Sequence, residues 1–192
     1  MIRKPKNWNE VQEYTDRQKL PLDAYVCKVK QCKVIDNNYG EQLAILFDIT
    51  EGEYANYFQK DFNGNTAQDK KWRGILRMWL PKDDGSDNDE MTKRTFKGMT
   101  TAFERSNPGY QWDWNENSLV GKTVGILFRN EEYDYQGKQG WAVRPFRAIS
   151  ADTVRDGEYT LPKDKPLKNK PASAPAANNG YVEVDLDDEL PF

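Results

Sequence analysis

The chain has 192 residues, of which 37% are hydrophobic and 12% aromatic, so it can fold as one domain with a buried core and a tail. Its 28 basic and 31 acidic side chains leave a net charge of −3, and the absence of histidine excludes a nucleophile–histidine pair and argues against zinc. No apolar run is long enough for a transmembrane helix, and no apolar signal segment follows the basic N-terminus. We therefore expect a cytoplasmic protein that does not associate with membranes.

Residues 1–20 are predicted to contain a short helix that docks on the main domain. Trp8, Val11 and Tyr14 or Thr15 recur at roughly helical spacing. The proline that follows this segment ends it, because proline cannot continue the hydrogen-bond pattern of a helix.

Three strands are predicted in the next part of the chain. Residues 24–35 alternate between apolar and polar side chains, and residues 42–50 do so again after a turn over residues 36–40. Gly52 interrupts the second strand, and residues 54–58 are predicted to form the third.

Two cysteines lie in the first predicted strand. The offset of five between Cys27 and Cys32 places them on opposite faces of a regular strand, so they cannot easily form a disulfide. Their spacing fits no common zinc motif. We expect two buried thiols, no metal and no other cofactor.

A helix is predicted in the middle of the chain. Residues 72–80 fit either a strand or a helix, and residues 83–90 read as a polar loop. Thr92 can cap a helix that runs to about Ser106. The residues that recur at helical spacing within it are Phe96, Met99, Thr100 and Phe103.

Two further strands are predicted at residues 119–129 and 141–149, joined by a hairpin loop at residues 130–140. The order strand, strand, strand, helix, strand, strand is that of an OB-fold, a five-stranded Greek-key barrel with a helix between strands 3 and 4. We therefore predict a mainly β domain over residues 21–160, with an open α+β sheet as the alternative. The aromatic residues expected in its core are Phe47, Phe96, Phe103, Phe128 and Phe146.

The last part of the chain differs sharply in composition from this domain. Residues 161–180 alternate lysine with proline and then turn to small residues, so they are predicted to be a flexible linker. Residues 181–192 hold five acidic and no basic side chains, which leaves 26 acids (31 minus 5) against 28 bases in the rest of the chain. The sequence thus predicts a mildly basic domain followed by an acidic, disordered tail.

The final six residues combine three acids with an aliphatic residue, a proline and a phenylalanine. They are Asp187, Asp188, Glu189, Leu190, Pro191 and Phe192. This string resembles the C-terminal tip of bacterial single-stranded-DNA-binding proteins, whose pattern is three Asp, Ile, Pro and Phe. In that family the tip recruits replication, repair and recombination enzymes, and the resemblance implies the same use here. The alternative is a solvated acidic tail that only maintains solubility.

A second resemblance is carried by short motifs spread over residues 20–160. These motifs are Leu22 and residues 25–28, 47–52, 96–97, 106–110, 112–114 and 119–122. Together they look like a family of small proteins encoded by bacteriophages and prophages and taken to be single-stranded-DNA-binding or recombination-associated. The resemblance implies a role in phage replication or recombination inside a bacterial host cell.

An OB barrel binds single strands by stacking bases on aromatic side chains and by contacting phosphates with Lys and Arg. Strands 2 and 3, the first hairpin loop and the loop between the last two strands usually form the groove. Residues 70–73 are the best local basic and aromatic cluster, whereas Glu131, Glu132 and Asp134 count against the second hairpin. The candidate DNA-binding residues are Lys28, Lys30, Tyr57, Lys60, Lys70, Lys71, Trp72, Arg73, Tyr133, Tyr135, Lys138, Trp141 and Arg144.

We predict that the protein is not an enzyme. A metal-dependent nuclease would need clustered carboxylates, and the acidic run over residues 83–90 has its glycine too early for an EF-hand loop. An adaptor whose barrel binds only protein is the other alternative. The expected partners are single-stranded DNA and, through the tip, host or phage replication and recombination proteins. The sequence is compatible with a homo-oligomer.

Overall fold

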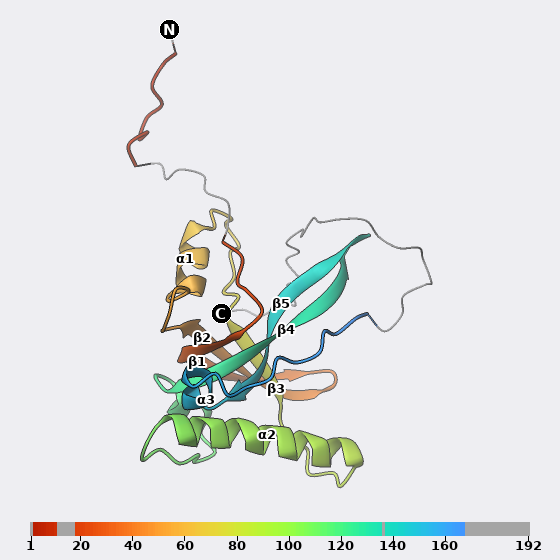
Figure 1. Cartoon of the computed structure of the whole chain (residues 1–192). Coiled ribbons are helices and arrows are strands. Elements are labelled where there is room, and N and C mark those ends of the chain that lie inside the picture. Colours follow the sequence, from red (N-terminus) through yellow and green to blue (C-terminus); the bar gives the residue numbers. More distant parts are fainter. Residues whose placement is uncertain (1, 11–17, 136, 168–192) are drawn as a thin grey trace.

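A single antiparallel sheet organises the protein. The computed structural model describes residues 2–10, 18–135 and 137–167. Its strands are β1 (Ala24–Asn37), β2 (Gly40–Ile49), β3 (Ile75–Trp79), β4 (Thr123–Tyr135) and β5 (Lys138–Ile149), and they pair in the order β3-β2-β1-β4-β5 (Figure 1). The prediction of a mainly β domain is confirmed.

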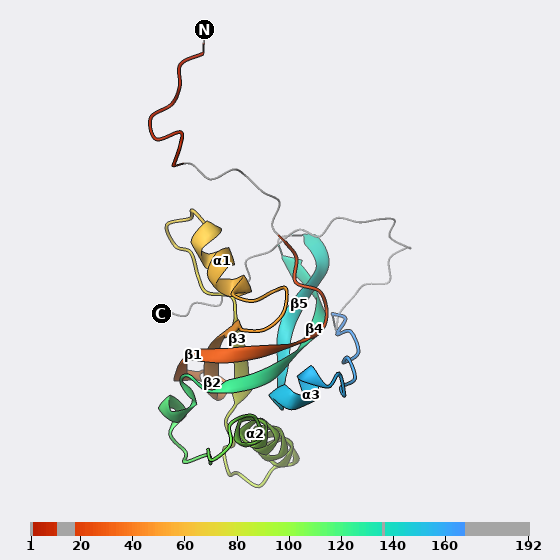
Figure 2. The same ribbon diagram turned by 60° about the vertical axis from the view of Figure 1, so that its left-hand side comes forward.

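Helices close the two ends of this sheet. α1 (Tyr57–Gly64) lies at one end and α2 (Asp87–Ser106) runs along the other, as Figures 1 and 2 both show. α2 stands between β3 and β4 in the chain, where the sequence predicted a helix. A 3-10 turn, η1 (Glu116–Leu119), precedes β4, and α3 (Ala151–Arg155) follows β5.

The sheet is curled so that its two end strands approach each other. β3 and β5 are in contact, although within the described residues no hydrogen-bonded ladder joins them. The core lies inside this curl and is completed by residues of α2. Its largest fully buried side chains include Phe47, Phe103, Phe128 and Met99.

The predicted third strand at residues 54–58 is wrong. This segment enters α1 instead, because the buried Asp48 carboxylate accepts the backbone N–H groups of Phe58 and Gln59 at the start of the helix. The third strand is β3, within the stretch that fitted either a strand or a helix.

Helix α2 begins earlier than the sequence indicated. Ser86, rather than Thr92, is the N-cap, and its hydroxyl accepts a hydrogen bond from the backbone N–H of Asp89 at 3.2 Å. Acidic side chains in the first turn stabilise a helix through its macrodipole. Half of the predicted polar loop over residues 83–90 is therefore the first turn of α2.

The second hairpin is longer than predicted. β4 begins at Thr123, after the 3-10 turn that replaces the expected start of the strand. β4 and β5 then remain paired out to Tyr135 and Lys138, so most of the predicted loop over residues 130–140 is strand. The hairpin extends away from α2 in both views (Figures 1 and 2).

A β-bulge in β1 changes which side chains share a face. The register slips between Val29 and Gln31, so Lys30 is an extra residue opposite β2. Because of it, Cys27 pairs with Ile49 and Cys32 with Ile45, and both cysteines point into the core as free thiols. The prediction that they lie on opposite faces is wrong, because it assumed a regular strand.

The aromatic core was largely predicted from the sequence. Four of the five expected phenylalanines are buried. The exception is Phe146, which is half-buried and lies between the guanidinium groups of Arg129 and Arg147, at 4.1 and 5.8 Å from its ring centroid. A second bulge in the pairing of β4 with β5, between Leu127 and Phe128, leaves it without a partner residue.

The two ends of the chain are described only in part. Residues 6–10 form turns, and residues 11–17, which hold most of the predicted N-terminal helix, lie outside the described residues. At the other end, Lys165 pairs with the free edge of β4 through backbone hydrogen bonds with Asn130 and Glu132, both of 2.9 Å. Residues 168–180 of the predicted linker and the tail at residues 181–192 lie outside the described residues.

Candidate nucleic-acid interface

Cross-strand pairing gathers basic and aromatic side chains on the outer surface of β1, β2 and β3. Lys33, Ala44 and Arg77 form one row across the three strands. The next row includes Trp79, whose side chain is 43% exposed. These rows face away from the core because the residues that alternate with them, such as Ile45, are buried inside it. We call this surface the outer face.

The bulge at Lys30 extends the outer face toward α1. Its ammonium group is 3.0 Å from the side-chain oxygen of Gln59, 3.8 Å from an oxygen of Asp48 and 5.1 Å from the ring centroid of Trp72. In a regular strand Lys30 would pair with a residue of β2. In the bulge it has no such partner, and its side chain contacts Asp48, Gln59 and Trp72 instead. This lysine therefore joins β1 to the segment that precedes β3.

Trp72 is held at this position from two sides. Its indole N–H donates to the backbone oxygen of Phe47 at 3.0 Å, and its ring lies 5.8 Å from that of Phe62 in α1. The ammonium group of Lys70 lies over the Phe62 ring at 4.6 Å. Lys30, Phe62, Lys70 and Trp72 thus form a basic and aromatic cluster, the α1-side cluster, in which the predicted cluster at residues 70–73 is partly realised.

Asp48 links this cluster to β2, because its carboxylate binds both the start of α1 and Lys30. Its side chain accepts backbone N–H bonds from Ile49, Phe58 and Gln59, at 3.0, 3.0 and 3.1 Å. Burial raises the pKa of the Asp48 carboxyl, while the three N–H donors and the charge of Lys30 oppose that shift. The carboxylate thereby anchors α1 to β2 and holds one positive charge of the interface.

The other predicted residues of this region are spread around the cluster. Lys28 is exposed and pairs in register with Asp48. Lys60 is exposed on α1, while Lys71 and Arg73 are half-buried beside Trp72 in the chain. Tyr57 is packed edge-to-face between Tyr54 and Phe58, at 6.3 and 5.2 Å, so its ring serves the packing of α1.

The predicted residues of the second hairpin do not share one face. Tyr133, Tyr135, Lys138 and Arg144 are on the side opposite to Trp141, which pairs with Glu132. Tyr133 is only 4% exposed and covers Gly140, where any added Cβ would come within 2.6 Å of the tyrosine oxygen. Because it is buried, Tyr133 does not offer its ring to a base.

Three outer-face residues were missed by the sequence analysis: Lys33, Arg77 and Trp79. Regular alternation along β1 would have turned Lys33 toward the core, and only the bulge brings it outward. Arg77 and Trp79 belong to a stretch that fitted either strand or helix, so no face could be assigned to them. The available indication was their spacing of two residues, which places both on one side of a strand.

The described residues contain no group of three or more carboxylate, cysteine or histidine side chains arranged to hold a metal ion. In the same part of the chain, no helix has the length and apolar character needed to cross a membrane. No protein-family model matches the sequence, and no curated protein matches it significantly.

Proposed function

We propose that this protein binds single-stranded DNA without sequence preference, on the outer face and the α1-side cluster of an OB-type barrel. The order β3-β2-β1-β4-β5, the contact between β3 and β5, and the place of α2 between β3 and β4 support a partly open Greek-key barrel. In such barrels the surface of strands 2 and 3 contacts oligonucleotides.

One observation carries the proposal: the outer face and the α1-side cluster each combine cations with flat aromatic rings. Lys30, Lys33 and Arg77 can neutralise phosphates, and Trp72 and Trp79 can stack on bases. Each stacked base contributes about 1–3 kcal/mol, and every base has a π-face, so such a surface tolerates any sequence.

The second hairpin supplies a flank for the same strand of DNA. Lys138 and Tyr135 lie at its tip, and Arg144 lies opposite Arg129 on the same face. Arg129 forms an ion pair with Glu131. We therefore assign the phosphate contacts of this hairpin to Lys138 and Arg144.

The second part of the proposed function concerns the acidic C-terminal tip. We assign residues 187–192 the role of recruiting replication and recombination enzymes of the phage or its bacterial host, supported by the sequence resemblance alone, since the tip lies outside the described residues. An acidic segment speeds encounter with basic partner surfaces, and Phe192 offers a ring for an apolar slot.

A fluorescence titration tests the DNA-binding proposal. Tryptophan emission of the full-length protein should be quenched to saturation by a thymidine oligomer, less at high salt, and weakly by a duplex of equal length. Trp79→Ala should weaken binding by about 1–3 kcal/mol through a lost stacking platform. Arg77→Ala should lower the affinity and reduce the slope of log K against log salt by about 0.7, the value for one phosphate contact on a single strand.

Arg105→Ala is the matched control, because Arg105 is an exposed arginine in the last turn of α2, away from the outer face. Its affinity should equal that of the unchanged protein. No quenching at either salt concentration would refute DNA binding and leave the protein-only adaptor. Cleavage of labelled DNA with magnesium or manganese, abolished by a carboxylate variant, would point to a nuclease instead.

A further inference from the structure

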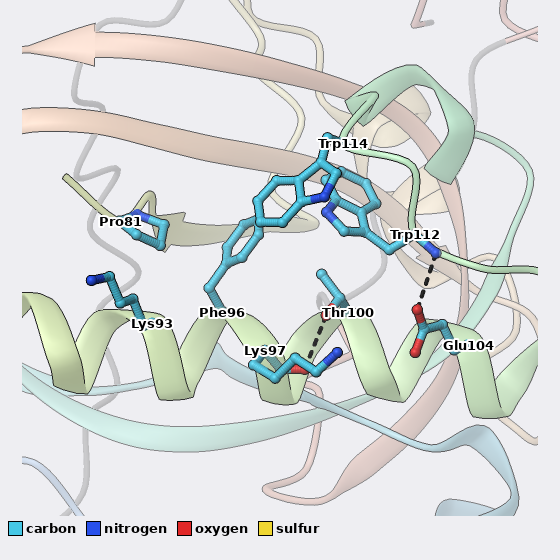
Figure 3. Close-up of a pocket in the computed structure, with 8 residues that line it drawn as sticks. All are labelled: Pro81, Lys93, Phe96, Lys97, Thr100, Glu104, Trp112 and Trp114. Carbon is cyan, nitrogen blue, oxygen red and sulfur yellow. Dashed lines mark hydrogen bonds between the residues drawn. The ribbon is translucent and has the colours of Figure 1, made fainter. Parts of the chain in front are cut away.

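A pocket of about 200 Å³ lies beside α2 (Figure 3), and none of its lining residues belongs to the outer face. It is formed where the segment between α2 and η1 folds back over the helix. Figure 3 shows both tryptophans of that segment above Phe96, with Lys97 and Glu104 on the helix below. The lining residues that matter below are Pro81, Phe96, Lys97, Glu104, Trp112 and Trp114.

Trp114 is displayed in an unusual way for a large aromatic residue. It is 77% exposed, its backbone has a left-handed φ of 65°, and its ring stacks on Phe96 at 6.1 Å and 22°. A left-handed conformation costs a residue with a side chain roughly 1–2 kcal/mol. The fold therefore holds an apolar ring in solvent at a cost in stability, which is typical of a binding surface.

Trp112 supplies a donor without an acceptor. Its indole nitrogen is buried and has no hydrogen-bond partner among the described residues, and leaving such a group unpaired costs about 1–3 kcal/mol. Its backbone N–H, in contrast, donates to the Glu104 carboxylate at 3.1 Å. The Trp112 indole N–H can therefore still take up an acceptor, such as a carbonyl oxygen of a ligand.

The charges around the pocket favour a basic ligand. The Lys93 ammonium, at the pocket wall, is held by Asp83, Asp89 and Glu90 at 2.8, 3.1 and 3.1 Å. Together with these three partners, four carboxylates, counting that of Glu104, surround the two ammonium groups of Lys93 and Lys97. Phosphates and the acidic tail would both be repelled.

We propose that this pocket binds the lysine- and proline-containing segment of residues 168–175, from the same chain or from a second copy. This segment holds Lys168, Lys170, Pro171 and Pro175. In an extended polyproline II conformation, backbone carbonyls make no internal hydrogen bonds, so one of them can accept from Trp112. Proline rings pack on exposed aromatic side chains, here Trp114, and lysine pairs with Glu104.

The covalent connection raises the local concentration of this segment. It follows directly on Leu167, whose backbone N–H donates to Glu132 at the edge of β4. A segment tethered to its own binding site, or presented by a bound second copy, needs only weak intrinsic affinity. The inference does not depend on DNA binding, because the pocket and the outer face share no residue.

The test uses a fluorescein-labelled peptide with the sequence of residues 165–176 and the full-length protein. A linker variant, in which both lysines and both prolines of residues 168–175 become serine, should bind this peptide more tightly than the unchanged protein, because its own segment no longer competes. In that variant, Trp114→Ala should weaken binding at least ~10-fold, as expected for an aromatic anchor. Trp79→Ala, an exposed tryptophan on the outer face, should leave it unchanged.

Two further measurements identify the contacts. The indole N–H resonance of Trp112, assigned with Trp112→Phe, should move on peptide addition, and a peptide with Ala for Pro should bind at least ~5-fold more weakly. Absence of saturable binding, equal affinity for Trp114→Ala, or preferential binding of a peptide of residues 181–192 would overturn the proposal. Oligonucleotide affinity is measured in parallel, so a failure here is distinguishable from a failure of DNA binding.

Discussion

Asp48 shows how one side chain can determine a local structure. It lies on β2, is 2% exposed, and accepts three backbone N–H bonds, two of them from the first turn of α1. The residue in the N-cap position, Asn56, has a left-handed backbone and makes no side-chain cap. Asp48, from strand β2, therefore accepts the first backbone N–H groups of α1, which a neighbouring N-cap side chain accepts in most helices.

Asp48→Ala is expected to lower the free energy of unfolding by about 1–3 kcal/mol, because the buried N–H groups lose their acceptor. Asp48→Asn keeps one acceptor oxygen and should cost less. Urea unfolding followed by circular dichroism measures both, with Asp69→Ala, an exposed acid, as the control for loss of charge. An Asp48→Ala protein as stable as the unchanged one would show that α1 does not depend on this anchor.

The same residue explains why the third strand was predicted in the wrong place. Nothing within residues 54–58 indicates that a carboxylate ten residues earlier will cap a helix there. The local pattern of aromatic residues is compatible with both structures, and the contact with Asp48 decides between them. Here the hydrogen bonds from Asp48 outweigh the local strand propensity of residues 54–58, as tertiary contacts often do.

At the scale of elements, α3 is fastened to the end of β2 by an ion pair. Arg155 donates to both oxygens of Glu51, its Nη2 at 2.6 Å and its Nε at 3.1 Å, and also to Asp152 at 2.7 Å. The hydrogen bond with Arg155 lowers the pKa of the Glu51 carboxyl. Beneath α3, Gly125 leaves no room for a side chain, since an added Cβ would lie 2.5 Å from Val154.

Arg155→Met should therefore reduce the free energy of unfolding by less than about 1 kcal/mol at pH 7, because the pair is largely exposed and screened by solvent. A carboxyl with a lowered pKa in the folded state contributes stability above its ordinary pKa and loses it as the pH falls. The difference between the two proteins should shrink from about pH 5 toward pH 3. Chemical unfolding across this range measures it, and a difference that grows in acid would contradict the assignment.

The strands themselves were predicted well because alternation is a local property. β1, β2 and β5 begin and end within a few residues of the predicted ranges, and α2 ends where the sequence indicated. The bulge in β1 was not predictable, because it depends on the pairing with β2 rather than on β1 alone. Its consequence was large, since it moved Cys32 inward and Lys33 outward.

At the scale of the whole molecule, opposite charges are separated along the chain. The outer face and the α1-side cluster are basic, whereas residues 181–192 hold five acidic and no basic side chains. In the absence of DNA, such a tail can occupy the basic surface, and it then competes with the phosphates of incoming DNA; this hypothesis follows from charge alone.

Deletion of residues 181–192 is accordingly expected to tighten binding of a thymidine oligomer at low salt, with the difference fading at high salt as charges are screened. Fluorescence titrations of the two proteins at both salt concentrations measure this effect. A chain in which the acids of this segment are replaced by their amides controls for length. Equal or weaker affinity after deletion would exclude competition by the tail.

By itself, the sequence determined the mainly β class, the position of the central helix and most of the aromatic core. The division into domain, linker and acidic tail stays a prediction, because residues 168–192 lie outside the described residues. These properties depend on composition and on periodicity over a few neighbouring residues. Only the tertiary structure decided that Asp48 starts α1, that Tyr133 is buried, that Lys33, Arg77 and Trp79 share one face, and that Lys30 lies over Trp72. Those outcomes depend on strand register and on contacts between residues far apart in the chain, which no local pattern encodes.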